Sequence, residues 1–464
     1  MIKLTTQQIA DILKAKLIGR GDIVVETTST DTRQAIENGL FFALKGENFD
    51  AHNYLENAVA QGCVAVVVER ECEINVPQIV VANTRLALGE LAKWLKAKLN
   101  PKTVAMTGSS GKTTVKEMTA KILQKMTACD DEVLYTFGNL NNDLGVPMTL
   151  LRLTEQHKYA VVELGANHIG EIAYTTEITQ PDACLVNNVA PAHLEGFGSL
   201  AGVAQAKGEI YRGLKADGKA IVNLAFYYPE WQKEIGSHEM QSFSYIGSDK
   251  DSYADYWAEN VQLHLAGSRF TLHTPQGEVE IELPYLGKHN VSNALAATSL
   301  AMSVGATLEA VKAGLEQRSM VKGRLFPVQI NEHCLFIDDT YNANVDSMKS
   351  AISVLENYPA YRIFVVADMG ELGEESGACH QEVADFAKEA NLDLIVSFGK
   401  ESAVISQNSE HHFTDKQKMV EFLTPIILQK VEQKQPLVLL AKGSRSQKME
   451  TVISELCKLF NLNF

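Results

Sequence analysis

The chain has 464 residues, and its 42 Lys and Arg against 57 Asp and Glu give a formal net charge of −15. This acidic balance argues against a nucleic-acid-binding protein, which usually presents a basic face. The hydrophobic fraction of 45% and the charged fraction of 21% are typical of a soluble globular protein and exclude global disorder.

The chain is not expected to enter a membrane or to carry disulfides. No apolar run approaches the roughly 18–20 residues of a membrane span, and the N-terminus has no continuous apolar segment of the signal-peptide kind. The seven cysteines are scattered and form no CxxC motif, which is typical of reduced thiols in a cytoplasmic protein.

At roughly 150 residues per domain, the length predicts three domains. Residues 1–82 mix short helical and apolar stretches and are predicted to form a small α/β domain. Residues 83–319 begin with a helical connector at 83–99 and form the predicted central domain. An α/β rhythm restarts in residues 320–464, which are predicted to form a doubly wound, Rossmann-like domain.

Apolar runs alternate with helical patterns in the central part, and this alternation predicts βαβ units on a parallel sheet. These runs span 102–107, 158–164, 183–189 and 220–223. A second set alternates apolar and polar residues between turn residues and predicts an antiparallel meander. Its members span 260–265, 269–274 and 278–283. Polar residues follow many of the apolar runs, at the strand ends where open α/β sheets bind ligands.

The strongest local motif is TGSSGKTT at 107–114, between a predicted strand and a predicted amphipathic helix. Its glycines allow a tight turn, so that backbone N–H groups and the helix N-terminus face a phosphate. Lys112 is expected to reach the β- and γ-phosphates, and Thr113 to offer its hydroxyl to Mg²⁺. The predicted ATP-binding residues here are Gly108, Ser109, Ser110, Gly111, Lys112, Thr113 and Thr114. Met106 replaces the first glycine of the general pattern.

Three residues elsewhere carry weaker signals. Glu163 ends an apolar run and is able to hold Mg²⁺ or a metal-bound water, whereas His193 follows the next run and Lys207 lies in a predicted helix. Taken singly, a solvated acid, a loop histidine and a surface lysine are also reasonable interpretations. The phosphate loop alone is equally compatible with an ordinary ATPase, although the absence of an NKxD segment argues against a GTPase.

In combination, the motifs resemble the Mur ligase family, the ATP-dependent amide-forming enzymes of peptidoglycan synthesis. The resemblance extends over nearly the whole chain. It is carried by TGSSGKTT, GNLNNDLGVP (138–147), VVELGANH, NNVAPAHLEGFGS, AKGEI, GKHNVSNALAA and DDTYNAN. STDTR (29–33), FFALKGENFDAH (41–52) and ADMGELGEE (367–375) resemble the branch that joins D-alanyl-D-alanine to UDP-N-acetylmuramoyl-tripeptide.

The resemblance implies ATP, two Mg²⁺ ions and those two substrates, in a monomer with no nucleic-acid or membrane partner. Lys112 with Glu163, His193 and Lys207 would be catalytic. The metal ligands would be Thr113, Glu163, His193 and Lys207, the last as a carbamate. Further ATP contacts would come from Asn290, Asn293, Arg324, Asp339 and Tyr341. Substrate contacts would come from Ser29, Thr30, Asp31, Arg33, Lys45, His52, Asn139, Asn142, Asp368 and Lys442.

The implied reaction activates the tripeptide carboxylate as an acyl phosphate, which the amine of the dipeptide then attacks. Two alternatives stay open within this class: another Mur ligase, or a folate polyglutamate-type ligase that adds a single amino acid. The STDTR and FFALKG segments argue against the folate enzyme. A third alternative, an ATP-dependent regulator or binding protein without ligase activity, is disfavoured by the joint presence of Glu163, His193 and Lys207.

Overall fold

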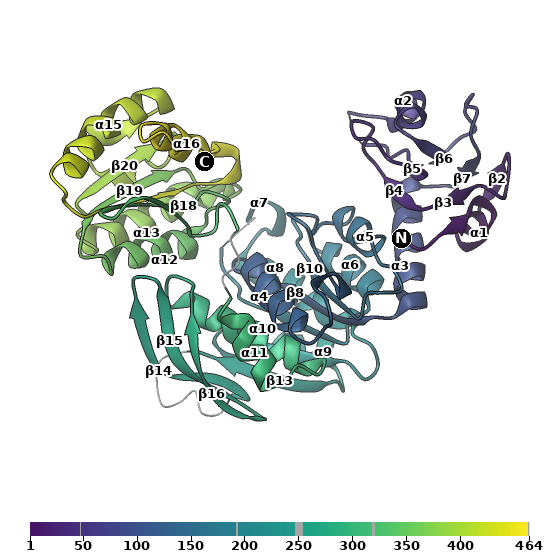
Figure 1. Ribbon diagram of the computed structural model, residues 1–464, viewed down its shortest axis with the longest axis horizontal. Coiled ribbons are helices and arrows are strands. Elements are labelled where there is room, and N and C mark those ends of the chain that lie inside the picture. Colours follow the sequence, from purple (N-terminus) through teal and green to yellow (C-terminus); the bar gives the residue numbers. More distant parts are fainter. Residues whose placement is uncertain (47, 192–193, 246–253, 318–320, 463) are drawn as a thin grey trace.

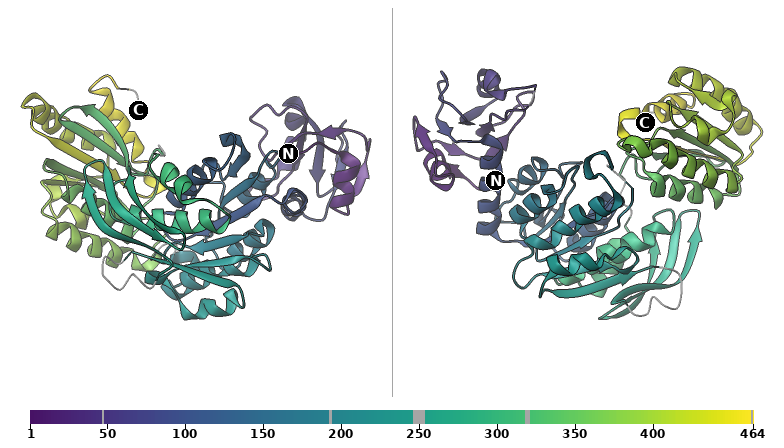
Figure 2. Two further views of the ribbon diagram at one scale, coloured as in Figure 1. Left: turned by 60° about the horizontal axis from the view of Figure 1, so that its bottom comes forward. Right: turned by 180° about the vertical axis from the view of Figure 1, so that it is seen from behind.

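Three α/β domains follow one another along the chain in a computed structural model, which describes residues 1–46, 48–191, 194–245, 254–317, 321–462 and 464. The N-terminal and C-terminal domains lie at opposite ends of the central domain in all the views (Figures 1 and 2). This confirms the predicted α/β fold class. No helix among the described residues is long and apolar enough to cross a membrane.

The N-terminal domain contains a five-stranded sheet in the order β2-β7-β6-β5-β4. Its strands are parallel except for the β2–β7 pair, and β1 and β3 form a separate antiparallel pair. The elements are β1 (Leu4–Thr5), α1 (Thr6–Ile12), β2 (Lys16–Ile18), β3 (Val24–Val25), β4 (Thr27–Ser29), β5 (Gly39–Phe42), α2 (Leu55–Ala60), β6 (Cys63–Val68) and β7 (Gln78–Val80).

The central domain is built on a nine-stranded sheet in the order β16-β15-β14-β13-β12-β11-β8-β10-β9. Its first half contains α3 (Thr84–Leu99), β8 (Lys102–Thr107), α4 (Lys112–Gln124), β9 (Val133–Tyr135), α5 (Gly145–Leu150), β10 (Tyr159–Glu163), α6 (Glu171–Thr179), β11 (Ala183–Val186), α7 (Leu194–Phe197) and α8 (Leu200–Gly208). Its second half contains β12 (Lys219–Asn223), α9 (Gln232–Ile235), β13 (Glu239–Ser244), β14 (Tyr256–His264), β15 (Gly267–Thr274), β16 (Gly277–Leu283), α10 (His289–Ser303) and α11 (Leu308–Leu315).

The central strands β8, β10, β11 and β12 are buried on both faces, which explains why they read as continuous apolar runs. Alternate residues of β8 point to opposite sides: Ala105 packs in the core that α3, α5 and α6 cover, whereas Val104 and Met106 pack beneath α4, α10 and α11. The predicted meander is present as β14, β15 and β16, and it continues the main sheet because β14 pairs in parallel with β13.

The helix α3 joins the N-terminal domain to the central domain (Figure 1). Its buried residues Leu88 and Leu91 belong to one core cluster together with Phe42 of the N-terminal sheet and Leu150 of α5. The segment predicted as a connector therefore packs against both domains, and apolar contacts hold the N-terminal domain against the central one.

The C-terminal domain has a six-stranded sheet in the order β17-β18-β22-β19-β20-β21, parallel except for the β17–β18 pair. Its elements are β17 (Phe326–Asn331), β18 (Cys334–Asp339), α12 (Val345–Glu356), β19 (Tyr361–Ala367), α13 (Ser376–Glu389), β20 (Leu394–Phe398), α14 (Ala403–Ser406), β21 (His412–Phe413), α15 (Lys416–Glu432), β22 (Leu437–Lys442) and α16 (Glu450–Lys458). Leu286 of the central domain is buried in the core of this domain, among residues of α12.

The packing of α11 against α4 yields a first prediction. A Cβ atom added at Gly314 would lie 2.5 Å from Cα of Ile122 in α4. Gly314→Ala should therefore lower the free energy of unfolding by about 1–3 kcal/mol through overpacking. Gly377→Ala is the matched control, because it lies in a helix with no atom within 4 Å of the added Cβ. Equal stability of the two variants in urea titrations would contradict the packing argument.

Candidate active site

The phosphate-loop motif connects β8 to α4 in the middle of the nine-stranded sheet. Gly111 has a φ of +77° at the N-cap of α4, a left-handed conformation that favours glycine. A Cβ atom there would lie 2.6 Å from both Nδ2 of Asn187 and Oδ1 of Asn293. The glycine N-cap supplies no side chain to the first turn of α4, whose backbone N–H groups are thus available to an anion.

The side chains of two asparagines directly after strand β11 hold this loop in place. Asn188 accepts a hydrogen bond from the backbone N–H of Ser110 at 2.9 Å, and its Nδ2 donates to the Ser110 carbonyl at 3.1 Å. Asn187 is buried and donates from Nδ2 both to the Ser110 carbonyl at 3.1 Å and to Oδ1 of Asn293 at 2.9 Å. Neither asparagine was among the predicted site residues, although both directly follow an apolar run.

The predicted adenine-side residues Asn290 and Asn293 continue this chain of amides. Nδ2 of Asn293 donates to Oδ1 of Asn290 at 2.8 Å, and Nδ2 of Asn290 donates to the Leu286 carbonyl at 2.8 Å. The phosphate loop, the start of α10 and the segment that enters the C-terminal core are thereby connected by consecutive hydrogen bonds.

Lys112 curls back over the phosphate loop, where Nζ donates to the Gly108 carbonyl at 2.6 Å. The pKa of Lys112 is lowered, chiefly by burial and also by the charge of Arg324, and the negative charge of Glu163 opposes this only in part. The lysine therefore lies within electrostatic reach of the carboxylate that ends β10 and of an arginine from the C-terminal domain.

Glu163 stands at the end of β10, beside the end of β8. The residue is buried, and its Oε1 accepts a hydrogen bond from Nδ2 of Asn141 at 2.7 Å. Its other oxygen, Oε2, is buried with no hydrogen-bond partner among the described residues, and so is Oγ1 of Thr107. Such oxygens suit a hard divalent cation, and Mg²⁺ is commonly bound by one or two carboxylates together with substrate phosphates.

The donor set around Glu163 therefore fits the implied Mg²⁺, to which Thr113 could add its hydroxyl. No group of three or more His, Cys, Asp or Glu side chains that could hold a metal occurs within the described ranges. His193, a further predicted ligand, lies outside the described residues.

Lys207 lies in the last turn of α8 with its side chain buried. Nζ lies 5.4 Å from the centre of the Phe197 ring. Burial and, next, the charge of Lys112 lower the pKa of Lys207 to about 7. The surface-lysine interpretation is therefore wrong, because this side chain is removed from solvent.

The C-terminal domain contributes two further ionic groups. The Arg324 guanidinium stacks 4.1 Å above the centre of the Tyr341 ring, and Nε of Arg324 is buried with no hydrogen-bond partner among the residues described. Nζ of Lys442 is 2.6 Å from Oδ2 of Asp339, and both side chains are buried. Lys442 was predicted on the substrate side, but the structure pairs it with the residue predicted to bind ATP.

The two consecutive aspartates of β18 have different surroundings. Asp338 accepts hydrogen bonds from the backbone N–H groups of Gly323 and Thr340 at 2.8 and 3.1 Å, and burial raises its pKa. Asp339 instead lines the cavity between the central and C-terminal domains. Asp339 also accepts a backbone N–H, that of Leu325 at 3.2 Å, but of the two aspartates it is the one that lines the cavity.

This cavity has a volume of about 680 Å³, within the range of about 300–1,000 Å³ that small-molecule sites occupy. It brings together most of the predicted ATP residues from both domains. Its lining includes Ser110, Gly111, Thr113, Thr114, Asn290, Asn293, Arg324, Asp339 and Lys442. His289 lines it too, and burial lowers the pKa of that imidazole to about 4, so the ring is neutral at pH 7.

The predicted residues of the N-terminal domain are not among those that line this cavity. They lie at the end of β4, on the segments after β4 and β5, and, for His52, in a short 3-10 helix (Ala51–Tyr54). Ser29 is buried and accepts a hydrogen bond from the Asp31 N–H at 2.9 Å. Arg33 is 87% exposed and pairs with Asp31 at 2.6 Å, which lowers the pKa of Asp31 to about 2. Lys45 is exposed, and Thr30 is half-buried.

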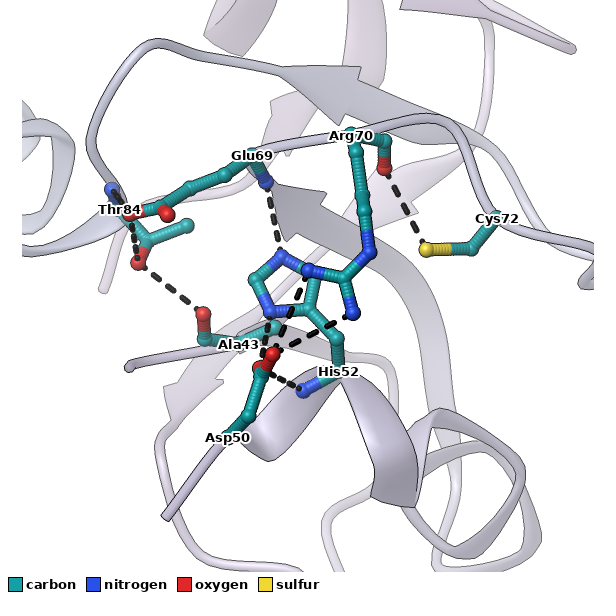
Figure 3. Close-up of polar contacts among 7 residues, drawn as sticks. All are labelled: Ala43, Asp50, His52, Glu69, Arg70, Cys72 and Thr84. Atoms are coloured by element: carbon teal, nitrogen blue, oxygen red, sulfur yellow. Dashed lines mark hydrogen bonds and ion pairs between the residues drawn. The ribbon is translucent and has the colours of Figure 1, made fainter. Parts of the chain in front are cut away.

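His52 is enclosed by protein groups (Figure 3). Its side chain has no exposed surface, Nδ1 lies 2.6 Å from Oδ1 of Asp50, and Nε2 accepts the Glu69 N–H at 2.9 Å. Burial raises the pKa of Asp50, but hydrogen bonds from His52 and Arg70 outweigh it and bring the pKa to about 2. Glu69 in turn accepts the N–H of Thr84 at 3.0 Å, at the start of α3.

Three remaining predicted residues are engaged in different ways. Asn142 accepts the Gly145 N–H at 2.8 Å at the start of α5, whereas Asn139 is exposed on the same loop. The carboxylate of Asp368 accepts backbone N–H groups of three residues that follow β20, at 2.8–3.0 Å. Asp368 therefore ties the ends of β19 and β20 together.

A phosphate loop in a parallel sheet, facing a second α/β domain across a cavity, defines a multidomain nucleotide-dependent enzyme. The Mur ligase middle domain model matches residues 106–301, and the model of the Mur ligase glutamate ligase domain matches residues 323–456. The chain belongs to the Mur ligase family and is an ATP-dependent ligase.

Relatives match over nearly the full length. A UDP-N-acetylmuramoyl-tripeptide–D-alanyl-D-alanine ligase of Haemophilus influenzae is 61% identical over 98% of this chain and 99% of its own. A crystal structure of MurF from Acinetobacter baumannii is 40% identical, with a TM-score of 0.90 over 98% of this chain and 99% of that one. MurF ligase from Thermotoga maritima, in complex with ADP, is 26% identical, with a TM-score of 0.81 over 94% and 98%.

The enclosure of His52 yields a second prediction. His52→Ala removes the acceptor of the Glu69 N–H and one of the side-chain contacts of Asp50, which keeps its hydrogen bonds from Arg70. The cost of a buried unsatisfied group is about 1–3 kcal/mol. Urea unfolding of the N-terminal domain should show this loss, while the affinity for ADP in calorimetry stays unchanged. Lys45→Ala, at an exposed site on the same loop, should leave stability unchanged. Wild-type stability of His52→Ala would contradict a structural role for the ring.

Proposed function

We propose that this protein joins D-alanyl-D-alanine to the terminal carboxylate of UDP-N-acetylmuramoyl-tripeptide, with ATP converted to ADP and phosphate. The product is UDP-N-acetylmuramoyl-pentapeptide, a precursor in peptidoglycan synthesis. The observation that carries this proposal is the full-length similarity to ligases of that name, together with retention of the phosphate loop, Glu163 and the buried Lys207.

The arrangement of charges supports an acyl-phosphate route. A carboxylate does not react with an amine at neutral pH until its oxygen becomes a leaving group, and a phosphoryl transfer achieves this. Lys112 and the N–H groups that begin α4 are placed to neutralise the transferred phosphoryl group. Arg324, from the C-terminal domain, lines the same cavity as Gly111 and Thr113 at the start of α4.

Two Mg²⁺ ions, when bound, would supply further positive charge for the phosphates. Thr113, Glu163, His193 and the carbamate of Lys207 are their proposed ligands. The unpartnered Oε2 of Glu163 supports the assignment of Glu163 as a ligand. The pKa of about 7 of the Lys207 amine supports the carbamate, because only a neutral amine adds CO₂ to form one.

Each domain has a proposed role. Residues 1–82 would bind the uridine end through Ser29, Thr30, Asp31, Arg33 and Lys45, with His52 fixing the loop that carries Lys45. Residues 83–319 would hold ATP and direct Asn139 and Asn142 towards the peptide. Residues 320–464 would bring Arg324, Asp339, Tyr341 and Lys442 onto ATP and place the loop that contains Asp368 near the dipeptide. We place the enzyme in the cytoplasm, as its dispersed free cysteines indicate.

An acceptor-dependent assay tests this function. ADP release from ATP should require both UDP-N-acetylmuramoyl-tripeptide and D-alanyl-D-alanine, because the acyl phosphate turns over only when an amine attacks it. Single amino acids, including glutamate, should not replace the dipeptide. Equal ADP release without any acceptor would instead indicate an ordinary ATPase, and release driven by a single amino acid would favour another ligase of the family.

The carbamate assignment has a separate test. Lys207→Ala should abolish turnover while preserving the fold, and short carboxylates such as formate or acetate should restore part of it by replacing the missing anion. ¹³C-labelled bicarbonate should give a carbamate signal in the wild-type protein that is missing in this variant. Unchanged turnover in Lys207→Ala would remove the lysine from the site.

A further inference from the structure

The loop between β9 and α5 reaches the carboxylate at the end of β10 through one side chain. Asn141 lies in this loop, and its Nδ2 donates to Oε1 of Glu163 at 2.7 Å. The neighbouring residues Asn139 and Asn142 do not share this contact, since Asn139 is exposed and Asn142 caps the start of α5. The three asparagines of the GNLNND motif therefore have different structural positions.

The two oxygens of the Glu163 carboxylate have different surroundings. Oε1 is occupied by the Asn141 amide, whereas Oε2 is buried with no hydrogen-bond partner in the described part of the chain. The backbone N–H of Glu163 is also fixed, because it donates to Oγ1 of Thr136 at 3.0 Å. With its backbone and one oxygen held, the carboxylate presents a single free oxygen in a defined direction.

The backbone after Glu163 is shaped around the same asparagine. The N–H of Gly165 donates to the Asn141 carbonyl at 2.8 Å. A Cβ atom at Gly165 would lie 2.9 Å from Cγ and Oδ1 of Asn141 and 3.1 Å from Nδ2. These are the three nearest atoms to that position, so the missing side chain of Gly165 leaves room for the Asn141 amide in particular.

We propose that Asn141 is a positioning residue for the catalytic cation: it binds one oxygen of Glu163 so that the other is held ready for a divalent metal ion. This rests on the proposed role of Glu163 as a metal ligand. Neutral amide donors that orient a ligating carboxylate act on metal affinity and on ligand geometry together. Asn141 itself contributes no charge, so the negative charge of Glu163 stays available to the cation.

Direct measurement of metal binding tests the proposal without depending on turnover. Mn²⁺ is titrated into the enzyme in complex with a non-hydrolysable ATP analogue, and free Mn²⁺ is followed by electron paramagnetic resonance. Asn141→Ala should weaken Mn²⁺ binding about 10-fold to 100-fold, the usual effect of losing a group that orients a metal ligand. The Mg²⁺ concentration for half-maximal turnover should rise with it, more than KM for the UDP-linked substrate.

Gly165→Ala provides an independent variant that leaves Asn141 in the sequence. Its Cβ should displace the Asn141 amide and reproduce the loss of Mn²⁺ affinity. Asn141→Ala removes the amide atoms that the Cβ of residue 165 would displace. Gly165→Ala in the Asn141→Ala background should therefore cause no further loss of Mn²⁺ affinity. Additive losses in the double variant would overturn the proposal, because contacting residues that act through one interaction are not additive.

A stability control separates positioning from general loss of structure. Asn83 caps α3 by accepting the Leu86 N–H at 3.0 Å, so Asn83→Ala should lower stability without changing Mn²⁺ affinity. Wild-type Mn²⁺ affinity in a folded Asn141→Ala protein would overturn the proposal while leaving the ligase function intact. Glu163→Gln separates the positioning role of Asn141 from the metal-ligand role of Glu163. Wild-type Mn²⁺ affinity in Glu163→Gln would refute the role of Glu163 on which the proposal rests.

Discussion

Burial of charge at the carboxyl edge of the central sheet is the constraint around which the rest of this molecule is arranged. Lys207 and Glu163 are removed from solvent there, and Lys112 packs against the phosphate loop beside them. Burial lowers the pKa of both lysines, and one oxygen of Glu163 has no partner among the described residues. An unpaired buried charge is costly, so the site is electrostatically complete only with a polyanion and its cations.

The architecture around this edge keeps these groups in position before any ligand arrives. Parallel strands β10, β8 and β11 place their ends side by side, so that Glu163, the phosphate loop and Asn187 come from three adjacent strands. The amide chain through Asn293 and Asn290 then reaches Leu286, whose side chain is packed in the C-terminal core. Residues 286–293 thus both hold the phosphate loop and attach the C-terminal domain to the central one.

The overall acidity of the chain and the nature of its ligands are reconciled by local charge. A net charge of −15 would oppose the approach of ATP and of a UDP-linked peptide. Arg324 and Lys442 line the cavity, and Lys112 lies between the lining residues Gly111 and Thr113. Cations held in a cleft act on a ligand with less screening by solvent than cations on the open surface. The net charge of the chain therefore says little about its ligands, which we propose to meet a few cations at the cleft.

Much of the fold followed from pattern alone. Continuous apolar runs identified β8, β10, β11 and β12, because a strand buried on both faces must be apolar throughout. The short strand β9 and the polar strand β13 gave no such signal and are defined by their pairing with β10 and β12. The phosphate loop was evident because its glycines and lysine act within eight consecutive residues, where local conformation suffices.

The sequence by itself therefore determined the class of enzyme and the α/β fold class. The tertiary structure decided how those residues are used: it enclosed His52 in protein contacts, paired Lys442 with Asp339, turned Asp338 inwards and assigned Asn141 to Glu163. The physical reason is that a hydrogen bond or an ion pair between distant residues depends on strand order and helix packing. No residue type or spacing along the chain specifies which partner a polar side chain will meet.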